Sequence, residues 1–185
     1  MIDHFTTLGQ PRRPWLDAEV LKDTFHRLSA FLHPDVPGTG DAVKFAALNA
    51  AYSILRDPAP RLRHLLELTA PEALSAAAAP PPELGDLFME IASLRRRLDD
   101  FFAKRNAATS PLARALLAGD EAALRRDLAA TQVRLGAADS AALAEVRVLD
   151  EGGGQVELLR PLYHRLSYLG RWRAQIREAL FSIGV

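Results

Sequence analysis

The sequence predicts an all-α protein, with a helical hairpin in its N-terminal part and a helical bundle in its C-terminal part. Alanine and leucine are abundant, whereas aromatic residues make up only 7% of the chain. Apolar residues recur at spacings of three and four along most of the sequence, which is the period of an amphipathic helix. No stretch alternates apolar and polar residues as a half-buried strand does. Together these observations favour helices packed on helices.

Composition limits the classes of function. The chain has 185 residues, 49% hydrophobic and 25% charged, which is enough to build a core in one domain or two small ones. Its 23 basic and 23 acidic residues balance, so no global charge attracts it to nucleic acid or to an anionic membrane. The absence of cysteine excludes disulfides, thiolate metal ligands and a cysteine nucleophile.

The sequence shows no targeting or membrane segment. Residues Met1 to Gly9 carry an acidic Asp3 and no long apolar run, unlike a signal peptide. No stretch approaches the roughly 20 apolar residues that a membrane span requires. We therefore expect a soluble, cytoplasmic protein with neither nucleic-acid nor membrane partners.

Three helices are expected in the N-terminal part, after a short helical turn over Asp3–Leu8. Aspartate at a helix start accepts hydrogen bonds from the free amides of the first turn, and proline is tolerated at the first helical position. Asp17, Asp41 and Asp57-Pro58 therefore predict three helix starts, and the first of these helices runs to about Leu32. Their apolar stripes are Leu21, Phe25, Leu28 and Leu32, then Phe45, Leu48, Tyr52 and Leu55, then Leu62, Leu65 and Leu66.

A short loop joins the first two of these helices. Pro34 lacks an amide hydrogen and biases His33 away from helical angles, so the helix ends there. The turn residues Pro37, Gly38 and Gly40 follow. Two amphipathic helices joined by a loop of this length are expected to lie antiparallel, stripe against stripe.

The composition changes after the third helix. Residues 69–82 contain Ala76–Ala79 and Pro80–Pro82, and three successive prolines are extended and stiff. We expect a linker here, between an N-terminal domain over 1–68 and a C-terminal bundle over 83–185. The bundle begins with a heptad pattern of apolar residues that predicts a long helix: Leu84, Leu87, Ile91, Leu94, Leu98 and Phe101.

The rest of the bundle is also predicted to be helical. Ser110-Pro111 marks a helix start, and the leucines that follow predict one or two helices, with Gly119 as the candidate break. Gly152–Gly154 predicts a loop, after which a last helix carries Pro161 in its first turns. The stripe of that helix is Leu159, Leu162, Leu166, Leu169, Ile176 and Leu180.

The tripeptide His33-Pro34-Asp35, here called the HPD motif, has a specific context. It follows a helix with an apolar stripe, opens a turn loop and precedes a helix with a matching stripe. This arrangement resembles the J-domain, a co-chaperone module that stimulates ATP hydrolysis by DnaK-type chaperones. The resemblance covers Asp3 to about Leu68, and it implies that His33, Pro34 and Asp35 contact the nucleotide-binding domain of the chaperone.

The helix before the motif supplies further candidates. The resemblance implies that this helix adds a basic face, and Lys22, His26 and Arg27 are the residues here that could form it. The alternative is that they are an ordinary solvated helix surface.

A second resemblance concerns the segment Leu48–Pro58 and much of the C-terminal part. LNAAYSILRDP, then Phe88-Met89-Glu90 and RLSYL at Arg165–Leu169, resemble the HscB family of iron–sulfur co-chaperones. The resemblance implies that the first helix of the bundle binds an IscU-type scaffold, on which clusters are assembled. It makes a DnaK/HscA-type ATPase the expected chaperone.

The heptad pattern identifies candidate residues for this second surface. With Leu87 and Ile91 facing the core, Met89 falls on the far side of the helix and Phe88 flanks the buried seam. An exposed apolar pair often marks a partner site. The candidate scaffold-binding residues are Phe88, Met89, Ala92 and Tyr168. The alternative is that Phe88 packs against a third helix.

Other chemistry has little support in the sequence. His4, His26, His64 and His164 lack the spacing of metal ligands, and Gly152–Gly154 lacks the lysine of a phosphate loop. We expect no cofactor, no metal and no catalytic residue. Two alternatives remain open: a J-domain protein for another client, with the bundle as an unrelated interaction or dimerisation module, and a helical enzyme with a catalytic His33.

Overall fold

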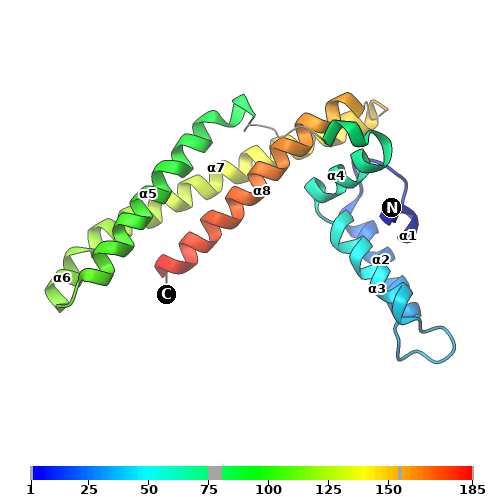
Figure 1. Cartoon of the computed structure of the whole chain (residues 1–185), viewed down its shortest axis with the longest axis horizontal. Helices are drawn as coiled ribbons and strands as arrows, with labels where there is room; N and C mark the ends of the chain where they lie inside the picture. The colour runs from blue at the N-terminus through cyan, green and yellow to red at the C-terminus, as the bar shows by residue number, and fades with distance from the viewer. Residues whose placement is uncertain (1, 75–80, 154–155, 185) are drawn as a thin grey trace. The chain divides into compact units, whose positions relative to one another are not determined.

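The computed structural model describes residues 2–74, 81–153 and 156–184, and every regular element in these ranges is helical (Figure 1). The predicted all-α class is therefore confirmed. The α-helices are α1 (His4–Thr7), α2 (Ala18–Leu32), α3 (Ala42–Leu55), α4 (Pro58–Thr69), α5 (Gly85–Ala107), α6 (Pro111–Leu116), α7 (Ala118–Glu151) and α8 (Val156–Gly184). Two short 3-10 helices, η1 (Pro71–Leu74) and η2 (Pro82–Leu84), lie between α4 and α5.

The predicted helix starts are confirmed by side-chain caps. The carboxylate of Asp17 accepts hydrogen bonds from the amides of Glu19 and Val20, both at 3.0 Å. Asp41 and Asp57 begin α3 and α4 in the same way. These caps satisfy amides that have no partner within the helix, which fixes where each helix begins.

The chain divides into two compact units. Among the described residues, one unit contains 2–74 and 142–166, and the other contains 81–141 and 167–184. The end of α7 and the start of α8 thus belong to the first unit. The expected bounds of the N-terminal domain, the linker and the bundle stay predictions, and residues 75–80 of the linker lie outside the described residues.

In the first unit, α2 and α3 form the predicted hairpin, covered by α1 and α4. The rings of Phe25 and Tyr52 stack across the hairpin with centroids 4.1 Å apart. Leu21 is the one residue of the α2 stripe that is fully buried, because much of the hairpin is only two helices thick. The core lies where the helices meet: Phe5, Leu8, Leu21, Leu48, Leu55, Leu62 and Leu66.

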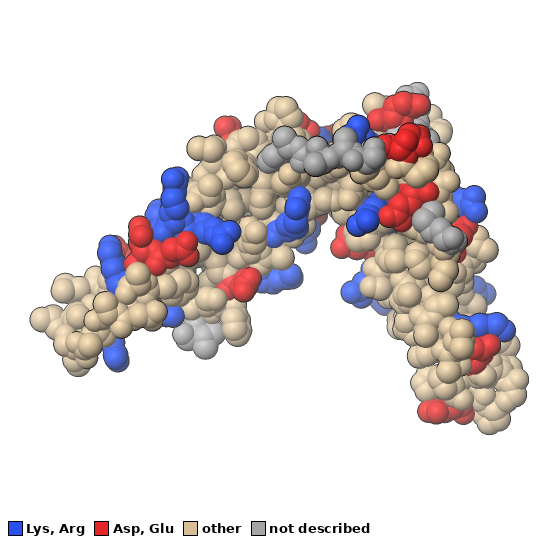
Figure 2. Space-filling model, in the orientation of Figure 1, with Lys and Arg blue, Asp and Glu red and all other residues tan. Residues whose placement is uncertain are grey.

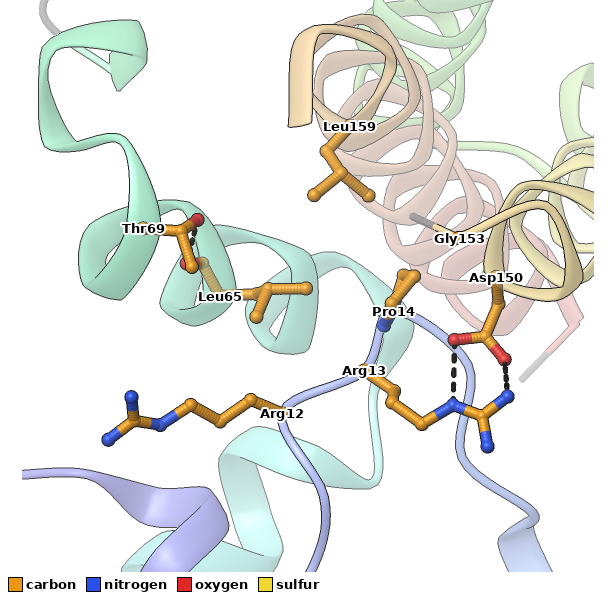
Figure 3. A pocket seen from close by; sticks show the side chains of 8 residues that line it. All are labelled: Arg12, Arg13, Pro14, Leu65, Thr69, Asp150, Gly153 and Leu159. Atoms are coloured by element: carbon orange, nitrogen blue, oxygen red, sulfur yellow. Dashed lines mark hydrogen bonds and ion pairs between the residues drawn. The ribbon is translucent and has the colours of Figure 1, made fainter. Parts of the chain in front are cut away.

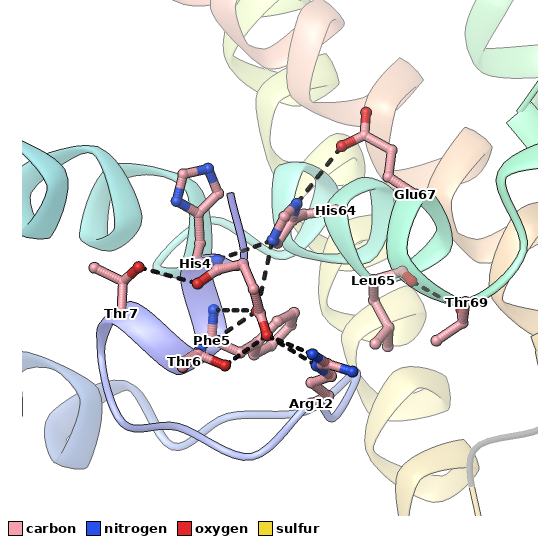
Figure 4. A network of polar contacts seen from close by, with 10 residues as sticks. His4, Phe5, Thr6, Thr7, Arg12, His64, Leu65, Glu67 and Thr69 are labelled. Carbon is pink, nitrogen blue, oxygen red and sulfur yellow. Dashed lines mark hydrogen bonds and ion pairs between the residues drawn. The ribbon is translucent and has the colours of Figure 1, made fainter. Parts of the chain in front are cut away.

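The helical turn α1 is anchored to α4 through a polar network (Figure 4). The backbone amide of His4 donates to Nε2 of the buried His64 at 3.1 Å. Asp3 caps α1 and is also bound by Arg12 at 2.7 Å. Burial raises the pKa of Asp3, but the hydrogen bonds from Thr6 and Arg12 outweigh it and lower the pKa to about 2.

The loop before α2 contacts the end of α7 within the same unit (Figure 3). The guanidinium of Arg13 donates two hydrogen bonds to the carboxylate of Asp150, which is buried. The neighbouring Trp15 lies 5.8 Å from the guanidinium of Arg147. A bidentate pair of this kind is geometrically specific, so it fixes the register of the loop against α7.

In the second unit, ion pairs show that the helices run antiparallel. Along α5 and α7, Glu90 pairs with Arg134 and Arg97 pairs with Asp127. Along α7 and α8, Arg173 pairs with Asp139, and Arg125 donates to the carbonyl of Ile183. All six residues of the predicted heptad pattern are buried: Leu84, Leu87, Ile91, Leu94, Leu98 and Phe101.

The expected break near Gly119 lies two residues earlier. The chain turns at Leu117, between α6 and α7, and Gly119 is the second residue of α7. Helix ends predicted from sequence patterns are uncertain by a few residues. Leu124, Leu128 and Leu135 of α7 are buried.

Arg61 is a charged residue buried in the first unit, with only 3% of its surface exposed. Its Nε donates to the carbonyl of Pro14 at 2.9 Å, and an Nη donates to the carbonyl of Leu55 at 2.8 Å. Burial lowers its pKa to about 10, so it remains charged at neutral pH. This side chain joins α4 to the end of α3 and to the loop before α2.

We predict that Arg61→Ala lowers the free energy of unfolding by about 2–4 kcal/mol, because two buried carbonyls lose their donors. Arg63 on the same helix is exposed and pairs with Glu67, so Arg63→Ala should change the free energy of unfolding by about 0.5 kcal/mol or less. Urea denaturation followed by circular dichroism measures both. Equal effects of the two substitutions would contradict this role of Arg61.

Candidate functional site

The HPD motif lies in a closed loop between α2 and α3. His33 follows the last residue of α2 and has extended angles (φ −55°, ψ 133°), as a residue before proline requires. At the base of the loop, the amide of Asp41 donates to the carbonyl of Leu32 at 3.1 Å. The hydroxyl of Thr39 donates to the carbonyl of Phe31 at 2.8 Å. The loop ends are therefore held together, and the motif projects into solvent.

Two contacts orient the imidazole of His33. Its Nδ1 accepts a hydrogen bond from the amide of Asp35 at 3.3 Å, and its ring meets the ring of Phe45 edge-on at 5.1 Å. Because Nδ1 is an acceptor here, the neutral ring carries its proton on Nε2. The Asp35 side chain is 89% exposed, with its carboxylate 3.7 Å from Nδ1. The loop thus offers one exposed donor and one exposed carboxylate.

The three basic candidates on α2 are all exposed, but they do not form one face. Lys22 and His26 are one turn apart and lie on the same flank of the helix. Arg27 is turned about 100° from His26, toward the opposite flank. Lys22 also pairs with Glu19 at 3.3 Å.

A second exposed surface lies where α5 meets α8 in the second unit. Phe88 is 44% exposed and Met89 62% exposed. Phe88 lies 6.2 Å from the ring of Trp172, which in turn lies 5.6 Å from the ring of Tyr168. Ala92 and Tyr168 are half-buried. We call Phe88, Met89, Ala92 and Tyr168 the apolar patch.

The surroundings of the apolar patch are charged. The guanidinium of Arg171 lies 4.4 Å from the ring of Tyr168. Farther along α5, Arg95, Arg96 and Asp99 are exposed. Figure 2 shows basic and acidic side chains next to one another over the middle of α5. The patch is thus an apolar surface within a mixed-charge surface, as is common for a protein interface.

Trp172 is the residue of this surface that sequence reasoning missed. It is only 6% exposed, and its ring is next to the rings of both Phe88 and Tyr168, so it is the buried neighbour that both rings share. The signal was present in the sequence: Leu169, Trp172 and Ile176 follow at spacings of three and four and continue the apolar stripe of the last helix.

Comparisons with known proteins agree with this architecture. No family model matches the chain. A HscB co-chaperone homologue of Burkholderia vietnamiensis is 32% identical over 173 residues, which cover 84% of this chain and 95% of that protein. A DnaJ chaperone of Nostoc punctiforme is 36% identical over 88 residues, and a HscB homologue of Bordetella avium is 35% identical over 72 residues. These two matches span only 22% and 43% of the relatives' lengths.

The chain belongs to the HscB co-chaperone family.

Solved structures of the HscB family share its fold. Chaperone HscB from Vibrio cholerae superposes with a TM-score of 0.61 at 22% identity, covering 96% of both chains. Human co-chaperone HscB superposes with a TM-score of 0.54 at 18% identity, covering 100% of this chain and 84% of that one. Both matches cover the hairpin and the bundle together, so the fold is shared along nearly the whole chain.

The HscB family is non-catalytic, and this chain belongs to it. Family membership therefore favours a co-chaperone over the alternative of an enzyme with a catalytic His33. Among the described residues, no group of three or more His, Asp or Glu side chains is placed to hold a metal ion. In the same ranges, no helix is long and apolar enough to cross a membrane.

A cavity of about 310 Å³ lies away from the HPD motif, beside the Arg13–Asp150 pair (Figure 3). Leu65, Thr69 and Leu159 line it, from α4 and from the start of α8. Its two arginines, Arg12 and Arg13, are already paired with carboxylates. The charged groups that the described residues contribute to its lining are therefore all paired, and we assign the cavity no function.

Proposed function

We propose that this HscB-family protein stimulates the ATPase of a DnaK/HscA-type chaperone and delivers an IscU-type iron–sulfur scaffold to it. In this proposal the HPD motif contacts the chaperone, with Lys22, His26 and Arg27 as additional contacts from α2. The apolar patch holds the scaffold.

The observation that carries the proposal is the exposed, oriented HPD motif. The closed loop and Pro34 fix the backbone before any partner arrives, so little conformational entropy is lost on binding. The Nε2–H of His33 can donate to an acceptor on the partner, and Asp35 can pair with an arginine. The motif supplies no chemistry itself, and instead favours one conformation of the partner ATPase.

The proposal assigns the two activities to different parts of the chain. We propose a J-domain over residues 1–68, a linker over 69–82 and a scaffold-binding bundle over 83–185. We also propose that the protein acts in the cytoplasm, where HscB-type co-chaperones typically work. The family membership and the two exposed surfaces support this division.

We predict that His33→Gln abolishes stimulation of the chaperone ATPase while the melting temperature changes by no more than about 1 °C. His33 is a half-exposed loop residue, and substitutions at such positions change stability little. A single-turnover ATPase assay with an HscA-type chaperone measures the effect, with Arg63→Ala as a surface control. Full stimulation by the variant would contradict the role of the motif.

We predict that Phe88→Ala/Met89→Ala weakens scaffold binding about thirtyfold or more, because truncation of an apolar anchor costs about 2 kcal/mol or more. Stimulation of the chaperone ATPase in the absence of scaffold should be unchanged, because the HPD motif is intact. Titration calorimetry with an IscU-type scaffold measures the affinity.

The matched control for this test is Leu112→Ala/Leu116→Ala on α6. It removes two leucines that are 72% and 75% exposed, but it leaves the apolar patch intact. Equal losses from both pairs would contradict the location of the site. If the native protein binds another client but no IscU-type scaffold, the alternative of a different client is correct.

A further inference from the structure

Gly40 lies in the HPD loop, at a position where the chain comes very close to the motif. A Cβ atom added to Gly40 would lie 2.5 Å from the carbonyl oxygen of His33 and 2.8 Å from that of Pro34. It would also lie 2.8 Å from the carbonyl oxygen of Val36. All three atoms belong to the backbone, so no side-chain rotation relieves the contact.

Position 40 requires glycine because there is no room for a Cβ atom, and not because of its backbone angle. The glycines with positive φ in the described ranges are Gly9, Gly38 and Gly153, and Gly40 is not among them. Gly38, two residues earlier, has a φ of 83° and nothing within 4 Å of an added Cβ. The same loop thus uses one glycine for its backbone angle and another for close packing.

The carbonyls that crowd Gly40 also hold the loop together. The amide of Val36 donates to the carbonyl of His33 at 2.9 Å, and the amide of Gly40 donates to the carbonyl of Val36 at 2.9 Å. Next to them, the amide of Asp41 closes the loop on Leu32. A Cβ at Gly40 would therefore displace the peptide units that carry His33 and Pro34.

We propose that Gly40 is a positioning residue for the HPD motif. Its missing side chain lets the returning chain pack against the carbonyls of His33 and Pro34, which fixes the direction of the His33 imidazole and the Asp35 carboxylate. This inference rests on the proposed contact between the motif and a DnaK/HscA-type ATPase. Gly40 itself makes no contact with the partner in this account.

The test compares substitutions at the two glycines of the loop. Gly40→Ala, and Gly40→Ser with the same Cβ, should raise the chaperone concentration for half-maximal ATPase stimulation about tenfold or more, the effect of losing one charge-assisted hydrogen bond. Gly38→Asn is the matched control, because asparagine tolerates a positive φ and its Cβ would have no atom within 4 Å. Scaffold affinity should remain native in all three variants, and Gly38→Asn should also keep the native melting temperature.

A second readout separates positioning from a general structural role. In an amide NMR spectrum, Gly40→Ala should shift the signals of residues 31–41, including Asp35, and leave those of α4 and α5 in place. Native stimulation by Gly40→Ala, or an equal loss with Gly38→Asn, would overturn the inference while the proposed function stands. If the native protein stimulates no such ATPase, the proposed function fails and the functional part of this inference fails with it.

Discussion

The closure of the α2–α3 loop is the constraint on which the HPD motif depends. The amide of Asp41 binds the carbonyl of Leu32 just where α2 ends and α3 begins, so the cap of one helix also fixes the end of the other. Stacking of Phe25 on Tyr52 holds the two helices together behind the loop. The exposed groups of the motif are therefore oriented by backbone contacts and by the helix pair, and not by a surrounding pocket.

The two proposed surfaces rely on different parts of the structure. The motif depends on the hairpin and on the contacts of α1 and α4, among them the buried guanidinium of Arg61. The apolar patch depends on the packing of α5 beside α8, where Trp172 supports the rings of Phe88 and Tyr168. Because the two surfaces share no residue, substitutions in one should leave the other intact, as is usual for independent sites.

Much of this organisation could be predicted from the sequence, because it is encoded locally. The aspartate caps and the apolar periodicity predicted the helices and the heptad pattern, and Pro34 predicted the end of α2. Trp172 was missed although its spacing was visible in the sequence, whereas the other missed features depend on residues distant in sequence or on backbone approach. The pairing of Arg13 with Asp150 joins positions 137 apart. The crowding at Gly40 depends on three carbonyls that only the folded loop brings together. The break expected at Gly119 lies at Leu117 instead, because sequence patterns locate helix ends only to within a few residues.

We propose that a single chain carries both surfaces and thereby brings the scaffold to the ATPase. The most direct measurement compares the native protein with an equimolar mixture of His33→Gln and Phe88→Ala/Met89→Ala, each with one surface intact. ATP hydrolysis by the chaperone is followed with the scaffold present. The account predicts that the native protein and the scaffold stimulate synergistically, whereas the mixture gives no more than the sum of its separate components. Synergy of native size from the mixture would contradict the account.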